Sequence, residues 1–130
     1  MLLSFVAKES ITLGTAVRIS PTTSGQIIPA NPSGFTNASV VGLSVDTVTS
    51  GALCRVVTDG AASVYSGLTP GTTYFLSHSG GYVVDYPTYV VELNQLGYAS
   101  SYLTQLGVAV SPTSLRVNAT EPILVVSGFL

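Results

Sequence analysis

Turn-forming residues interrupt this sequence so often that no long uninterrupted element fits into it. Thirteen glycines, seven prolines and many serines and threonines divide its 130 residues into short runs rich in valine and leucine. Runs of this length and composition, bounded by turn residues, are typical of strands in sandwiches and barrels. The sequence therefore predicts an all-β fold, a compact β-sandwich or barrel-like domain of short antiparallel strands.

The predicted strands are the aliphatic and β-branched runs between these turns. They cover residues 16–19, 26–29, 40–45, 52–58, 60–64, 73–77, 81–84, 106–110, 115–117 and 123–126. Asp59-Gly60 predicts a type I′ hairpin, in which both central residues have positive φ. Pro70-Gly71 predicts a type II turn, after which Tyr74-Phe75-Leu76 enters a strand. Ser79-Gly80-Gly81 predicts a reversal between the strands at 73–77 and 81–84.

Two parts of the sequence resemble each other. Val41-Gly42-Leu43-Ser44-Val45, followed by Leu53-Cys54-Arg55-Val56, is similar to Leu106-Gly107-Val108-Ala109-Val110, followed by Leu115-Arg116-Val117. Two copies are too few for a solenoid, so we expect two similar hairpins in one barrel-like core. The shared glycine indicates a close approach of backbones where strands bend.

One segment, residues 86–105, departs from this pattern. It holds four of the seven tyrosines, shows little alternation, and has Leu93 and Leu96 at a spacing that suits one face of a short helical turn. It is predicted to be a Tyr-rich irregular or short helical insertion, which either packs on its own sheet or contacts a partner. The rest of residues 11–130 is predicted to form a single β domain. Residues 1–10 are either an N-terminal arm or a first strand.

Charge is scarce, and this excludes several classes of function. Charged residues make up 8% of the chain, against about 25% in a typical domain. Four basic residues and a net charge of -2 do not supply the cations that nucleic-acid binding needs. Although the mean hydropathy is +0.53, no run approaches the ~20 apolar residues of a membrane-spanning helix. With a single lysine to protect strand edges, the surface instead predicts association with other protein subunits.

The sequence offers few groups for chemistry. A Ser-His-Asp arrangement of His78 with the nearby Asp85 is formally possible, but His78 lies in a Gly-Ser turn and no GxSxG motif is present. We therefore expect His78 to be a solvent-exposed turn residue and the chain not to be an enzyme. No motif for a phosphate, a metal ion or a cofactor occurs, so none is expected. The lone Cys54 is interpreted as a small buried hydrophobic residue rather than a reactive thiol.

Two longer motifs resemble a known group of proteins. The turn and strand Gly67 to Ser77 (GLTPGTTYFLS) and the hairpin Leu106 to Asn118 (LGVAVSPTSLRVN) are similar to segments of small β-rich virion proteins of tailed bacteriophages. That group includes capsid decoration (cement) proteins and modules of head or tail fibres. The resemblance covers about residues 10–120. This chain departs from the shorter pattern by the insertion at 86–105 and by its extension from Pro122 to Leu130.

The resemblance implies a mechanical function. Decoration proteins of this kind are homotrimers on the outer capsid surface, assembled in the bacterial host cytoplasm, that clamp neighbouring major capsid subunits without a cofactor. The candidate contacts with the capsid or between subunits are the apolar segments left over once the β core is assigned. They are Leu2, Leu3, Phe5, Val6, Tyr86, Tyr89, Leu93, Leu96, Tyr98, Tyr102, Phe129 and Leu130.

The alternative is a head- or tail-fibre module that binds a host receptor or a surface carbohydrate. Tyrosines offer flat faces to sugar rings, and the candidates for this role are Tyr82, Tyr86, Tyr89, Tyr98 and Tyr102. The absence of tryptophan and the scarcity of acidic residues speak against it.

Overall fold

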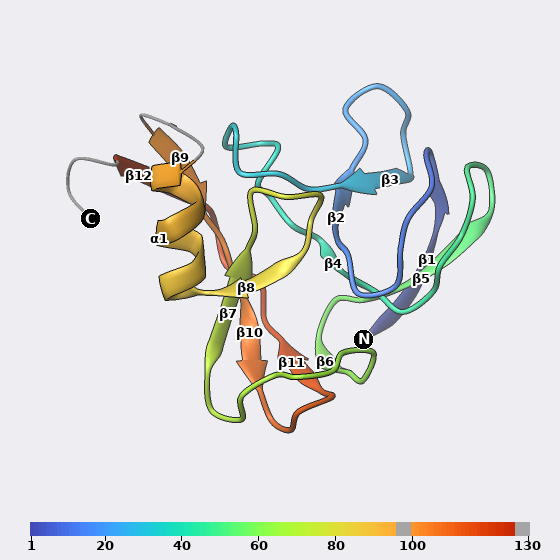
Figure 1. Ribbon diagram of the computed structural model, residues 1–130. Coiled ribbons are helices and arrows are strands. Elements are labelled where there is room, and N and C mark those ends of the chain that lie inside the picture. Colours follow the sequence, from blue (N-terminus) through green and yellow to red (C-terminus); the bar gives the residue numbers. More distant parts are fainter. Residues whose placement is uncertain (96–99, 127–130) are drawn as a thin grey trace.

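A closed five-stranded barrel forms the N-terminal part of the chain, and a separate five-stranded sheet lies beside it (Figure 1). The computed structural model describes residues 1–95 and 100–126. The expected all-β fold class is confirmed. Within these residues, no helix has the length and apolar character needed to cross a lipid bilayer.

The barrel is closed by the N-terminal strand. Its strands are β1 (Leu2–Ala7), β2 (Ala16–Ile19), β3 (Gln26–Pro29), β4 (Gly42–Ser44) and β5 (Leu53–Val57), in the order β1-β3-β2-β4-β5. β1 pairs antiparallel with β5, from Leu2 opposite Val57 to Val6 opposite Leu53, and parallel with β3. Of the two alternatives for residues 1–10, the structure therefore shows a first strand.

Alternation along the strands gives the barrel its own interior. Cys54 and Val56 point inwards, where they form a cluster with Ala7, Ile11, Val17 and Ile27. Phe5, Val41 and Val48 pack against this cluster from partly buried positions. The interpretation of Cys54 as a small buried hydrophobic residue is confirmed, since it is fully buried here.

The second sheet and a two-stranded ribbon use the rest of the chain. The sheet consists of β6 (Gly60–Ala62), β7 (Thr73–Leu76), β8 (Val83–Asp85), β10 (Gln105–Ala109) and β11 (Leu115–Val117), in the antiparallel order β6-β11-β10-β7-β8. β9 (Ser100–Leu103) and β12 (Ile123–Val126) form the ribbon. The helix α1 (Tyr86–Gln95) lies beside β7 and β8, on the ribbon side of the molecule (Figure 1).

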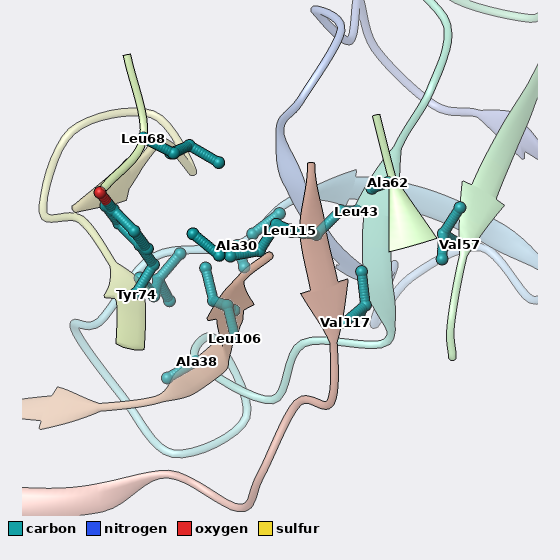
Figure 2. Close-up of a cluster of buried hydrophobic side chains, with 13 residues drawn as sticks. Ala30, Ala38, Leu43, Val57, Ala62, Leu68, Tyr74, Leu106, Leu115 and Val117 are labelled. Atoms are coloured by element: carbon teal, nitrogen blue, oxygen red, sulfur yellow. The ribbon is translucent and has the colours of Figure 1, made fainter. Parts of the chain in front are cut away.

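The main core fills the space between the barrel and the sheet (Figure 2). Val57, next to the inward-facing Val56, points out of the barrel and joins Leu43 in this core. The sheet contributes Leu106, Leu115 and other side chains from its facing surface. The buried members are Ala16, Ala30, Ala38, Leu43, Val57, Ala62, Leu68, Tyr74, Leu76, Leu106, Ala109, Leu115 and Val117.

Two of the predicted turns are confirmed. Gly71 has a φ of 83°, and the Thr72 N–H donates to the Thr69 carbonyl at 3.1 Å, as a type II turn at Pro70-Gly71 requires. The segment Ser79-Gly80-Gly81 reverses the chain between β7 and β8, with positive φ at both glycines. Both turns therefore form where the local sequence predicts them.

The predicted hairpin at Asp59-Gly60 is wrong. Gly60 has a φ of 107°, but Asp59 does not have a positive φ, so the turn is not type I′. The strands on its two sides belong to different sheets: β5 pairs with β1 and β4, whereas β6 pairs with β11. Asp59-Gly60 is therefore the point where the chain leaves the barrel and enters the second sheet.

Residues 86–105 contain regular structure. The helix begins after Asp85, whose carboxylate accepts the Thr88 N–H at 3.0 Å and so caps the first turn. Pro87 lies in that first turn, where its missing N–H has no cost. The predicted short helical insertion is therefore present as α1, but β9 was not predicted.

Candidate functional site

A cluster of polar side chains connects three elements near the ribbon. His78 follows β7, Glu92 lies on α1, and Ser101 lies on β9. Residues three and four positions apart lie on the same helix face, so Glu92 faces inwards together with Tyr89 and Leu93, both completely buried. The packing of α1 against β7 therefore brings the Glu92 carboxylate to His78.

The cluster forms a continuous chain of hydrogen bonds. His78 Nε2 lies 2.8 Å from Ser101 Oγ, and His78 Nδ1 lies 3.2 Å from Glu92 Oε1. The backbone N–H of His78 donates to the same carboxylate oxygen at 3.0 Å, and the Ser77 hydroxyl donates to Glu92 Oε2 at 2.7 Å. The carboxylate thus holds both the ring and the backbone of His78.

The hydrogen bonds of His78 lie in a buried environment. The His78 side chain is only 2% exposed, because the ring lies between Glu92, Ser101 and Tyr89. The expectation of a solvent-exposed turn histidine is therefore wrong. The local sequence could not indicate this burial, because α1 and β9, which cover the ring, lie far along the chain from the Gly-Ser turn that contains His78.

The acidic residue that contacts His78 is also not Asp85, which the sequence suggested. Asp85 caps α1 through the Thr88 N–H, and it is Glu92 that contacts His78. Burial alone would raise the pKa of Glu92, but hydrogen bonds from the His78 backbone, Ser77 and the His78 ring outweigh it and lower this pKa below its ordinary value. Glu92 is therefore a carboxylate at neutral pH.

Tyr89 completes the cluster. Its hydroxyl donates to Ser101 Oγ at 2.8 Å, and its ring lies against the His78 ring with centroids 4.7 Å apart. Burial raises the pKa of Tyr89, so the hydroxyl keeps its proton well above neutral pH. Ser101 consequently has a donor on one side and a histidine nitrogen on the other.

The cluster borders a cavity of about 330 Å³. Among the described residues, His78 and Ser101 form one part of its wall, and Asn31, Pro32, Ser33 and Ser100 form another. The side chains of Asn31, Pro32, Ser33, Ser100 and Ser101 carry no charge. No group of three or more potential metal ligands occurs among the described residues.

The predicted contact residues lie in different environments. Leu2, Leu3 and Tyr86 are exposed, Phe5, Val6 and Tyr102 are partly buried, and Tyr89 and Leu93 belong to the interior. Leu96, Tyr98, Phe129 and Leu130 lie outside the described residues. Of the tyrosines considered for sugar binding, Tyr82 and Tyr86 are exposed.

Sequence reasoning missed the exposed aliphatic side chains of β12. Ile123, Leu124 and Val126 are 62%, 55% and 43% exposed. The run is the predicted strand at 123–126, and its aliphatic sequence does not distinguish an exposed strand from a buried one. Its position in a two-stranded ribbon, away from both larger sheets, explains why it stays at the surface.

Comparison with known proteins does not assign the chain to a family. No protein-family model matches the chain, and no curated protein matches it in sequence.

Proposed function

We propose that this chain is a bacteriophage capsid decoration protein, which binds the outer capsid surface as a homotrimer and clamps neighbouring major capsid subunits. The sequence motifs at 67–77 and 106–118 suggest this class of protein. The observation that carries the proposal is the open, uncharged edge of β12. Such an edge suits a protein that functions in contact with other subunits.

The geometry of the ribbon leaves this edge available. β12 pairs with β9 on one side, and no strand in the described part of the chain pairs with its other edge. On β9, the Tyr102 N–H donates to the Pro32 carbonyl and so points away from β12. In an antiparallel pair the opposite residue, Leu124, then points its own backbone N–H and carbonyl towards the open edge.

Exposed aliphatic side chains accompany these free backbone groups. An edge of this kind, without lysine or proline within the strand, readily pairs with another chain. Burial at an interface stabilises a complex by about 25 cal/mol for each Å² of apolar surface removed from water. Several capsid subunits bound in this way would be held together without any chemical reaction.

The fibre-module alternative has less support. Of its five candidate tyrosines, Tyr89 is completely buried and Tyr102 packs against the main core. Tyr82 and Tyr86 remain at the surface, and the Tyr86 ring contacts Phe75 edge-on, with centroids 5.9 Å apart. We therefore retain only the decoration proposal.

Binding to capsids tests the proposal. Capsids of the phage that encodes this chain, prepared without it, are mixed with purified protein and sedimented, and the bound protein is quantified. We expect the natural protein to bind at saturable sites and Leu124→Asp to lose binding, because the charge would be buried against the partner. Val110→Asp, which places the same charge at another exposed valine, is the matched control and should bind normally.

Both substitutions are at exposed positions, so both variants should keep the melting temperature of the natural protein. No saturable binding of the natural protein, or equal binding of Leu124→Asp and Val110→Asp, would contradict the proposal.

A further inference from the structure

The polar cluster has the order of a nucleophile, a base and a carboxylate. The Glu92 carboxylate only accepts hydrogen bonds, so the proton of the neutral His78 ring lies on Nδ1. Nε2 is then an acceptor for the Ser101 hydroxyl, 2.8 Å away. We propose that Ser101 is a nucleophile for small uncharged carboxylic esters, with His78 as its general base. This activity goes beyond the structural function and does not depend on it.

The Ser101 hydroxyl has two acceptors within reach. Besides His78 Nε2 at 2.8 Å, the Pro32 carbonyl lies 3.4 Å from Ser101 Oγ. The shorter contact is a well-formed hydrogen bond and the longer one is weak. The proton of Ser101 therefore points to His78, as removal by a general base requires.

Tyr89 supports the nucleophile from the other side. Its hydroxyl donates to Ser101 Oγ and stabilises negative charge as it develops on that oxygen. Glu92 does not contact the ester. It is a positioning residue that fixes the His78 ring and stabilises the imidazolium formed when Nε2 takes the proton.

The cavity sets the class of ester. Ser101 is 3% exposed, and it borders the cavity together with His78. Among the described residues that line this space there is no lysine or arginine, so they offer no cation to a carboxylate or phosphate substituent. Asn31 also lines the cavity, and its side-chain amide can donate to the ester carbonyl oxygen. A short acyl ester of a neutral alcohol fits these features.

The reaction is a hydrolysis in two steps. Ser101 Oγ forms a bond to the acyl carbon while its proton passes to His78 Nε2, and the ester C–O bond then breaks as the alcohol takes that proton. Water attacks the acyl-serine in the same way, giving its proton to His78. The acyl-oxygen bond of Ser101 breaks, the proton returns to Ser101 Oγ, and a carboxylic acid leaves.

Covalent labelling tests the proposal directly. The folded full chain is incubated with a small fluorophosphonate and its mass is measured, followed by peptide mapping. We expect one adduct on Ser101, none in Ser101→Ala, and labelling at least about 100-fold slower in His78→Gln. Ser66→Ala removes an exposed serine outside the cluster and should label normally.

Hydrolysis of p-nitrophenyl acetate separates a positioning role of Glu92 from a structural one. Glu92→Gln should lower kcat with KM unchanged, and with the melting temperature close to that of the natural protein. Absence of an adduct on Ser101 in the folded natural protein would overturn the proposal. So would an adduct that forms equally fast in His78→Gln or in protein unfolded with urea.

Discussion

Two glycines show how single residues fix the way strands meet. Gly42 and Gly107 have ordinary negative φ values, so neither is required for its backbone conformation. A Cβ atom on Gly42 would overlap the Val57 carbonyl oxygen, and one on Gly107 would overlap that of Arg116. Both belong to the repeated sequence pattern, and both lie in an antiparallel pair, β4 with β5 and β10 with β11. The expected close approach of backbones is therefore confirmed.

Gly107→Ala should destabilise the protein by about 1–3 kcal/mol, because β10 and β11 would have to separate to admit the methyl group. Gly34→Ala is the control, since its Cβ would meet only the Asn37 side chain at 3.4 Å and its φ is not positive. It should change the free energy of unfolding by no more than about 0.5 kcal/mol. Urea unfolding of both variants measures the difference, and equal effects would contradict the explanation.

The ion pair of Asp46 with Arg55 predicts a dependence of stability on pH. Side-chain hydrogen bonds from Arg55, with Nη2 at 2.8 Å, and the Arg55 backbone N–H lower the pKa of Asp46 to about 2. Because this pKa lies below the unfolded value of about 3.9, the pair stabilises the fold above about pH 4. That contribution should disappear as the pH falls to about 2.

The Asp46 carboxyl titration, followed by NMR, checks the first part, and a midpoint near 3.9 would refute it. Asp46→Asn should lose the part of the acid sensitivity that this pair supplies, seen as a smaller fall in unfolding free energy from pH 5 to pH 2.5.

Individual strands and the helix could be predicted where a local pattern of residues determined the structure. β2, β3, β11 and β12 have the predicted boundaries, because each is an aliphatic run between turn residues. For α1, two residues indicate the start of a helix: Asp85, which caps it, and Pro87, which lies in its first turn. The valines of the helix weigh against it locally, and packing on β7 and β8 decides the outcome. The hairpin predicted at Asp59-Gly60 does not form, because the strands on its two sides pair with partners elsewhere in the chain.

β1 belongs to the barrel, and this predicts the effect of removing it. Deletion of residues 1–6 should yield an unfolded or insoluble product, because it removes the partner of both β3 and β5 and exposes the barrel interior. Leu2→Ser, at an exposed position of the same strand, should fold normally. Circular dichroism and sedimentation distinguish the results. A folded deletion product that has lost only capsid binding would instead indicate a separate arm.

At the scale of the whole molecule, the sequence indicated the fold class but not the polar cluster. His78 and Ser101 are 23 residues apart, and His78 and Glu92 are 14 apart. They meet only when α1 packs on β7 and when β9 pairs with β12, and neither event has a signal near His78. The exposure of β12 likewise depends on where the ribbon lies, and not on its composition.

The copy number of this chain per purified virion tests the proposed structural function most directly. Quantitative mass spectrometry measures it against the major capsid protein of the phage that encodes the chain. A decoration protein predicts a ratio near one to one, or a fixed large fraction of it. Absence from the virion would contradict the proposal, and a few to a few tens of copies would indicate a fibre component instead.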